Sequence, residues 1–308
     1  MIKEKLGIPY MGSKRKLAPL ILNAITQRHP SLTDFYDLFG GGGSISFTAI
    51  RDYKFRVHYN ELNKHIYSLV EYLKTHKTLE PKFYKWVTRE EFFNQVNKTN
   101  ETADWYSGFV MSCWSFGNSQ NSYLYGAEIE NIKRLAHEFI VNGCLESMKQ
   151  LSLDIPNLLN YEDIQKRRLI FCDHIKKNIS ILEDSRVQNL ELLEHLTHLQ
   201  NLQNLQNLQI NNGSYEVTKI NGDYPVIYCD IPYKGTGEYK EGGFDHEKFY
   251  QWFANLDYPA YLSEYDAPFE KIESFKHRSS LSATNNKKKV FESIYYNGKG
   301  NPINQKLF

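Results

Sequence analysis

Residues 34–52 of the chain read DFYDLFGGGGSISFTAIRD, and this stretch decides the class of fold. Its first five residues predict a short buried strand, and the apolar-periodic segment at 45–53 predicts a helix. Between them lie the four glycines Gly40, Gly41, Gly42 and Gly43. Glycines let the backbone approach a ligand closely, and the start of a helix offers backbone N–H groups. The order of strand, glycine loop and helix therefore predicts an α/β fold with a loop at which a cofactor can bind.

The next strand-like run, FRVHYNEL at 55–62, ends in Asn60 and Glu61. Glu61 lies 20 residues beyond Gly41, which is the spacing at which nucleotide-binding sheets place a carboxylate for ribose hydroxyls. The strict GxGxxG pattern is absent, because Ser46 stands where the third glycine belongs. This departure disfavours a dinucleotide enzyme. Alone, the loop and the acid fit a methyltransferase or a plain structural turn equally well.

A second strand-like run lies far along the chain, in YPVIYCDIPYKGTGEY at 224–239. It predicts a buried strand that ends at Asp230 and is followed by a glycine-containing loop. The segment 244–256 then predicts a helix with Asp245 as N-cap and with Phe244 and Phe249 as a hydrophobic staple, and 259–265 predicts another strand. In an open α/β sheet, ligands bind at the carboxyl ends of strands, where we expect Asp230.

Composition excludes several classes of protein. The chain has 308 residues, 41% of them hydrophobic and 24% charged, and no apolar run approaches the roughly 18 residues of a membrane-spanning helix. The first ten residues lack the apolar core of a secretory signal, so we expect a cytoplasmic protein. The four cysteines are scattered without a CxxC pair, which argues against both disulfides and a zinc site.

The net charge of +1 conceals basic segments at both ends. Lys14, Arg15 and Lys16 are consecutive, and residues 271–308 hold eight basic and two acidic residues, a local charge of +6. A solvated surface explains either cluster, and together they also permit a nucleic-acid groove.

The middle of the chain, 79–182, has helical patterning and few strand signals, as expected of a helical insertion. Within it, WSFGNSQNSYLYG at 114–126 combines aromatic, Asn, Ser and Gly residues. Such a loop can stack on bases and hydrogen-bond to them. An ordinary loop with its aromatic side chains in the core explains the composition equally well.

Leucine recurs at every third position from Leu190 to Leu208, with three LQN triplets inside the repeat. Leucines three apart drift by roughly 60° per step around an α-helix, so they do not keep to one face of it. The period favours a short 3₁₀ or extended segment, or a leucine edge laid along another surface. We therefore expect a low-complexity spacer without chemistry.

Taken together, these segments resemble the Dam-like (D12 class) family of DNA adenine methyltransferases. The family's aromatic-x-Gly-Gly-Lys signature corresponds to Tyr10-Met11-Gly12-Ser13-Lys14, its D-x-F-x-G-x-G-S loop to Asp37, Phe39, Gly41, Gly43 and Ser44, its acidic-x-Asn segment to Glu61-Leu62-Asn63, and its DPPY tetrad to Asp230-Ile231-Pro232-Tyr233. The order of the motifs also matches, with the cofactor loop first, a long insertion next and the tetrad last.

The resemblance implies a Rossmann-like sheet that uses S-adenosylmethionine, with an inserted, mainly helical target-recognition domain. It implies the catalytic residues Asp230, Ile231, Pro232 and Tyr233, and the cofactor-binding residues Tyr10, Lys14, Asp37, Phe39, Gly40, Gly41, Gly42, Gly43, Glu61 and Asp230. No metal is expected, and the implied partner is double-stranded DNA, together with a cognate restriction endonuclease if the enzyme belongs to a restriction–modification system. Phage-borne and orphan settings fit equally well, and the target sequence stays open.

Three domain segments are expected: a first part of the methyltransferase domain at 1–78, the helical insertion at 79–182, and the rest of the methyltransferase domain at 183–308. The tetrad departs from the family at Ile231, whose expected role rests on a backbone carbonyl that every residue possesses. The alternative hypothesis is a nucleic-acid-binding protein that keeps the methyltransferase fold but has lost catalysis through this change. An RNA or protein-glutamine methyltransferase is disfavoured by the 193 residues between Asp37 and Asp230.

Overall fold

The computed structural model describes residues 6–155, 157–178, 186–233, 243–278 and 289–300. The expected glycine-containing loop at 234–239, the first five residues, and Lys287, Lys288 and Lys306 of the basic segment lie outside the described residues. The chain divides into two compact units. The first comprises Met1–Leu6, Lys14–Asn63 and Gln203–Phe308, and the second comprises Gly7–Ser13 and Lys64–Leu202.

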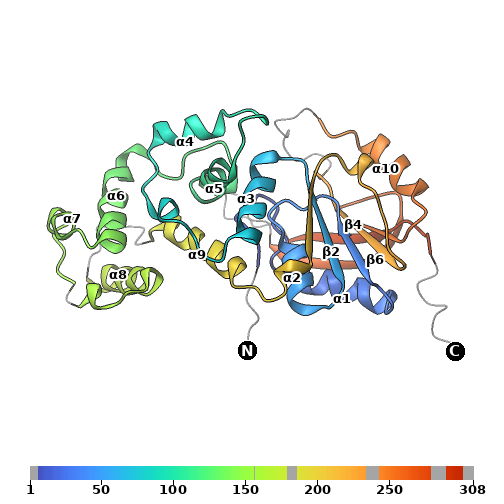
Figure 1. The fold of residues 1–308 in the computed structure, drawn as a ribbon, viewed down its shortest axis with the longest axis horizontal. Helices are drawn as coiled ribbons and strands as arrows, with labels where there is room; N and C mark the ends of the chain where they lie inside the picture. The colour runs from blue at the N-terminus through green and yellow to red at the C-terminus, as the bar shows by residue number, and fades with distance from the viewer. Residues whose placement is uncertain (1–5, 156, 179–185, 234–242, 279–288, 301–308) are drawn as a thin grey trace. The chain divides into compact units, whose positions relative to one another are not determined.

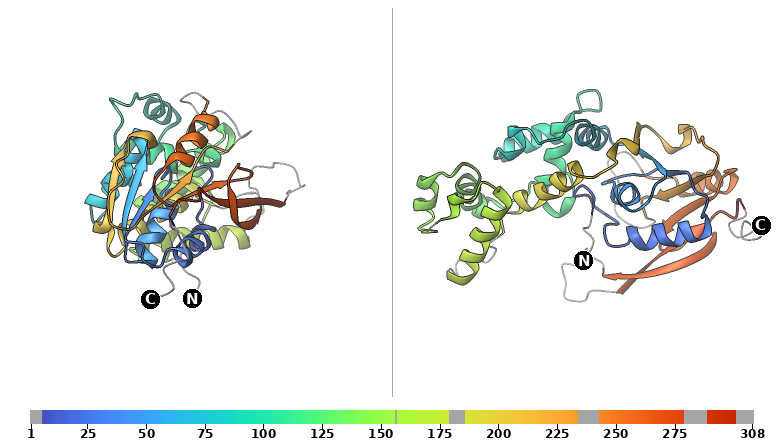
Figure 2. Two further views of the ribbon diagram at one scale, coloured as in Figure 1. Left: turned by 90° about the vertical axis from the view of Figure 1, so that its right-hand side faces the viewer. Right: turned by 60° about the horizontal axis from the view of Figure 1, so that its bottom comes forward.

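The first unit is built on a seven-stranded sheet in the order β3-β2-β1-β4-β5-β7-β6 (Figure 1). Its strands are β1 (Asp34–Asp37), β2 (Arg56–Glu61), β3 (Leu208–Asn212), β4 (Pro225–Asp230), β5 (Ala260–Glu264), β6 (Glu270–Arg278) and β7 (Lys289–Tyr296). The first five are mutually parallel, whereas β7 runs antiparallel to both β5 and β6. Strands β6 and β7, orange to red in Figure 2, form this antiparallel edge. The architecture is a mixed α/β fold consistent with a methyltransferase.

The helices of this unit are α1 (Ala18–Arg28), α2 (Ser44–Asp52) and α10 (His246–Asn255). Side chains alternate between the two faces of the sheet. Tyr36, Ile227 and Cys229 pack in one apolar cluster with residues of α10. Phe35 and Tyr228 stack on each other on the opposite face. The central strands are therefore buried on both sides, as a parallel sheet requires.

Most elements expected around the motifs are confirmed. Strands cover 34–37, 56–61, 225–230 and 260–264, and α2 follows the glycine loop. The Asp245 side chain accepts the N–H of Lys248 at the start of α10, and the rings of Phe244 and Phe249 lie 5.6 Å apart as a staple. Strands β3, β6 and β7 were not foreseen.

The second unit is helical. It contains α3 (Lys64–Thr75), α4 (Arg89–Val96), α5 (Trp105–Cys113), α6 (Ala127–Asn142), α7 (Leu145–Gln150), α8 (Ile164–Asn178) and α9 (Gln188–Gln200). The helices expected in the middle of the chain are thus present, and the helical region begins at residue 64 and extends to residue 202. Its role in target recognition remains a proposal.

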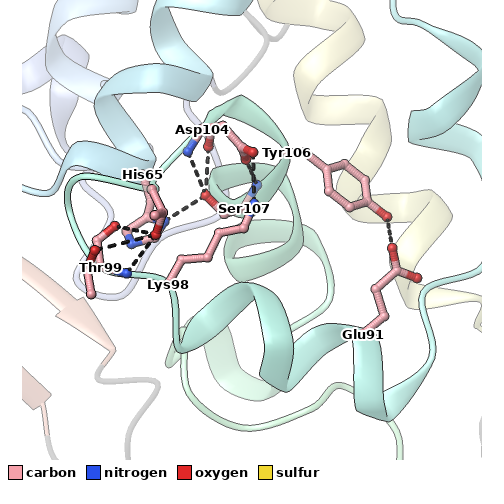
Figure 3. A network of polar contacts seen from close by, with 8 residues as sticks. His65, Glu91, Lys98, Thr99, Asp104, Tyr106 and Ser107 are labelled. Carbon is pink, nitrogen blue, oxygen red and sulfur yellow. Dashed lines mark hydrogen bonds and ion pairs between the residues drawn. The ribbon is translucent and has the colours of Figure 1, made fainter.

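A buried polar network ties α3 to α5 in this unit (Figure 3). The Asp104 carboxylate accepts the N–H of Ser107, and the Ser107 hydroxyl in turn accepts the N–H of Asp104, which makes a capping box. His65 Nδ1 lies 2.7 Å from Ser107 Oγ. These residues have the composition of a nucleophilic triad, but Ser107 is fully buried. The network therefore caps α5 and joins it to α3.

The expected conformation of the leucine repeat is wrong for its first half and confirmed for its second half, where Leu205–Asn207 form a 3₁₀-helix and β3 is extended. Leu190, Leu193, Leu196 and Leu199 are all buried in the regular helix α9, and Leu208 opens strand β3. Four leucines three apart drift by roughly 180°, so their burial requires cover around half of the helix. α9 packs against α3, α5 and α8, and these three neighbours provide that cover. The first half of the repeat is therefore a core helix and not a spacer.

Candidate active site

Three strands that are neighbours in the sheet end in a carboxyl group on the same edge. Asp37 ends β1, Glu61 ends β2 and Asp230 ends β4. The chain order reverses between β1 and β4, and ligands of open α/β sheets bind at such a switch point. Burial, together with the nearby carboxylates of Asp230 and Glu61, raises the pKa of Asp37 to about 7, although the hydrogen bond from Ser46 acts against the rise. This edge therefore favours a cationic ligand, which would offset the clustered negative charge.

The glycine loop packs closely against Tyr59, near the end of β2. Gly41 and Gly43 have φ angles of +48° and +71°, which favour glycine, and Gly43 is the N-cap of α2. A Cβ atom on Gly40 would lie 2.1 Å from the ring of Tyr59. The Tyr59 hydroxyl donates to the carbonyl of Gly41 at 2.7 Å. Close packing, and not only ligand approach, thus requires the glycines.

The Glu61 side chain is also hydrogen-bonded to this loop. Its carboxylate accepts the N–H of Gly41 at 2.7 Å and the N–H of Asn63 at 2.8 Å. The bonds fix the orientation of the carboxylate that the sequence predicts to bind the cofactor.

Ser46 explains why the third glycine is missing. Its hydroxyl donates to Asp37 Oδ2 at 2.7 Å, and both residues are buried. A glycine at this position would leave the buried carboxyl of Asp37 without this bond. The departure from GxGxxG therefore serves Asp37.

Asp230 lies against Lys14, which the sequence assigned to the cofactor. Lys14 Nζ is 2.9 Å from Asp230 Oδ1 and 3.5 Å from Glu292 Oε1, and it lies 4.7 Å from the centre of the Tyr233 ring. Burial opposes the ammonium, but the two carboxylates outweigh it and raise the pKa of Lys14. Burial likewise raises the pKa of Asp230 to about 6, with Lys14 acting against the rise and Glu292 adding to it.

The other two members of the tetrad are anchored from α10. The side chain of Ile231 is buried in the apolar cluster that contains Phe249 and Phe253. The carbonyl of Pro232 lies 2.8 Å from Nε2 of His246, the first residue of α10. The backbone that follows Asp230 is thus held by packing and by a hydrogen bond.

Phe39 and Tyr10, the remaining predicted residues, belong to different units of the chain. Phe39 packs in an aromatic group with Tyr215, Phe244 and Phe249, so it serves the core beside the loop. Tyr10 belongs to the second unit, whereas Lys14, from the same signature, belongs to the first.

Two residues of the site were missed. Glu292 is buried on β7, and a single acid inside the apolar run VFESIYY at 290–296 could have drawn attention to it. His246 has no comparable signal, because it follows an N-cap at an ordinary helix start.

Among the described residues, no group of three or more His, Cys, Asp or Glu side chains could hold a metal ion. In the same part of the chain, no helix combines the length and the apolar character needed to cross a membrane.

The mainly parallel sheet, the glycine loop bound by Glu61 and the strand-end Asp-Ile-Pro-Tyr are consistent with the α/β class of methyltransferases. The sequence model of the D12 class N6 adenine-specific DNA methyltransferase family matches residues 10–299 of the 308, and the chain belongs to that family. No curated protein matches the chain. The protein is accordingly a transferase, and its family acts on adenine in DNA.

Proposed function

We propose that the protein transfers a methyl group from S-adenosylmethionine to the exocyclic amino group of an adenine flipped out of double-stranded DNA, at a specific sequence. The observation that carries the proposal is Asp230 at the carboxyl end of β4, beside the switch point of the sheet and followed by Ile231, Pro232 and Tyr233. Family membership supports the acceptor.

The residues at the sheet edge fit the methyl donor. S-adenosylmethionine supplies an electrophilic methyl group on a sulfonium, and it carries positive charge and ribose hydroxyls. The acidic edge formed by Asp37, Glu61 and Asp230 suits the charge. Glu61, held by Gly41 and Asn63, would accept from the hydroxyls. Asp37 and the loop Gly40–Gly43 would line the same site.

The tetrad would activate the adenine amino group, which is the methyl acceptor. The adenine amino nitrogen is a poor nucleophile, because its lone pair is delocalised into the ring. Two hydrogen bonds, to the Asp230 carboxylate and the Ile231 carbonyl, would draw the nitrogen toward tetrahedral geometry. The N–C bond then forms as the S–C bond breaks, the S–C electron pair stays on sulfur, and the nitrogen releases one proton to Asp230 or water. Tyr233 would stack on the flipped ring.

We assign target recognition to the helical unit. Its loop after α5 displays Phe116, which is 66% exposed, between the buried rings of Trp114 and Tyr123. The loop is closed by the bond from Phe116 N–H to the Ser122 carbonyl, and Asn118 adopts a positive φ of 57°. An aromatic wedge beside amide side chains suits contact with DNA bases.

The direct test uses purified protein, labelled S-adenosylmethionine and unmethylated DNA, followed by sequencing for N6-methyladenine. Methylation at one recurrent motif is expected from the wild-type chain. Asp230→Asn keeps the shape of the side chain and should abolish transfer. Transfer by this variant at a near-normal rate would show that the catalytic assignment is wrong, and an inert wild-type chain would overturn the proposed function.

A further inference from the structure

One ammonium group lies between a partly buried carboxylate, that of Asp230, and a buried one, that of Glu292. Lys14 Nζ is 2.9 Å from Asp230 and 3.5 Å from Glu292, and the side chains of Lys14, Asp230 and Glu292 are 7%, 20% and 3% exposed. They come from the segment before α1, from β4 and from β7. The cluster therefore holds one ammonium and two carboxylates, where a single carboxylate would suffice to pair the lysine.

The second carboxylate works against the first in the absence of substrate. Glu292 repels the charge on Asp230, and burial already disfavours that charge. A buried Glu292 would thus weaken the acceptor that the adenine amino group needs. In the resting arrangement Glu292 shares the Lys14 ammonium with Asp230. A further function is needed to outweigh its unfavourable effect on the charge of Asp230.

The reaction supplies such a function. The adenine amino group must donate to Asp230, and its nitrogen becomes positively charged as the N–C bond forms. An ammonium bound to the same carboxylate competes for the acceptor and repels that charge. If Lys14 left Asp230 without another partner, it would be an unpaired buried cation, which is strongly unfavourable.

We propose that Glu292 is a positioning residue that receives the Lys14 ammonium when the flipped adenine takes its place on Asp230. This inference rests on the proposed function and deepens it. Lys14 would then occupy Asp230 in the resting enzyme and Glu292 in the reacting complex, and no proton transfer is needed for the exchange.

Other titratable groups face Asp230 and bear on any pH profile. They are Asp37 on β1, Tyr228 and Cys229 on β4, Tyr233 after β4 and Tyr265 after β5. Burial, followed by nearby carboxylates, raises the pKa of each of the three tyrosines, so these stay neutral over the pH range of the test.

The test uses three variants: Glu292→Gln, Lys14→Met, and the double variant that combines these two changes. The control is Glu273→Gln, which changes an exposed glutamate on the neighbouring strand β6. Single-turnover methyl transfer is measured from pH 5 to pH 9, and melting curves report folding. We expect Glu292→Gln to slow transfer by about 10²-fold while Glu273→Gln has no effect. Loss of the like charge should also move the acid limb of Glu292→Gln to lower pH, and Lys14→Met should move it to higher pH.

The double variant distinguishes the proposed movement of Lys14 from Asp230 to Glu292 from a purely structural role of Glu292. Without Lys14 no ammonium competes for Asp230, so the double variant should transfer faster than Glu292→Gln at pH 9. Equal rates in Glu292→Gln and Glu273→Gln would overturn the inference alone, as would a double variant slower than both single variants. Absence of transfer by the wild-type chain would overturn the proposed function and this inference with it.

Discussion

His246 Nε2 lies 2.8 Å from the carbonyl oxygen of Pro232, which links the first residue of α10 to the third residue of the tetrad. A carbonyl only accepts, so the Nε2 atom carries the proton of this bond. The bond holds the backbone next to the Ile231 carbonyl that we expect to contact adenine.

We predict that His246→Ala slows methyl transfer by about 10-fold, because the turn after Asp230 loses one anchor. His246→Gln can place an amide N–H near the same carbonyl and should keep most of the rate. Single-turnover kinetics with melting curves would check both variants. Equal loss in the two would mean that the hydrogen bond is not what matters.

The activity should depend on the ionisation of Asp230. Burial raises the pKa of this carboxyl to about 6, and only the ionised form is a full acceptor for the amino group. The rate of methyl transfer is therefore expected to be highest above that pH and to fall as the pH drops through about 6. A rate that stays level down to pH 5 would contradict this reading of the site.

Glu61→Ala should weaken binding of S-adenosylmethionine by about 10- to 100-fold, because the backbone N–H groups of Gly41 and Asn63 lose their acceptor and the proposed ribose contact is lost as well. DNA binding should change much less. Isothermal titration with each ligand separately distinguishes this from a folding defect, which would weaken both.

Two buried aspartates on β1 should affect stability with opposite signs. Burial raises the pKa of Asp37 to about 7, so the fold loses stability as the pH rises from about 4 through 7. Asp37→Asn should melt above the wild type at pH 8, and the difference should vanish near pH 4.

Asp34 is the matched control, because its bonds to Arg56 hold its pKa well below the usual range. Asp34→Asn should melt below the wild type at pH 8, and this deficit should shrink on acidification below pH 3.8. Shifts of the same sign in both variants would contradict the assignment.

The helical reading of the leucine repeat predicts unequal costs along it. Leu196 is fully buried in α9, so Leu196→Ala should lower the free energy of unfolding by about 2–5 kcal/mol. Leu202 is half-buried beyond the end of the helix, so Leu202→Ala should lower the free energy of unfolding much less. Denaturant titrations of the two variants would check this, and equal costs would argue against α9 as a core helix.

The motifs around Gly41 and Asp230 could be predicted because their signals are local. A strand, a turn residue and an N-cap lie within a few positions of one another, as Asp245 and Phe249 illustrate. The first half of the leucine repeat misled the prediction because burial in α9 depends on α3 and α5, which are distant in sequence, as well as on the preceding helix α8. Glu292 was missed for a similar reason, since its role depends on β7 lying beside β5 and near Lys14.

The burial of Ile231 bears on how such enzymes are found by their sequences. Its side chain lies in the apolar cluster that includes Phe249 and Phe253 of α10, and we expect only its backbone carbonyl to contact a substrate. The identity of this residue is then governed by packing in that cluster, and it can vary among apolar residues of similar size. A signature search that demands proline at this position would pass over chains like this one, whereas a pattern of Asp, any apolar residue, Pro and an aromatic residue would retrieve them.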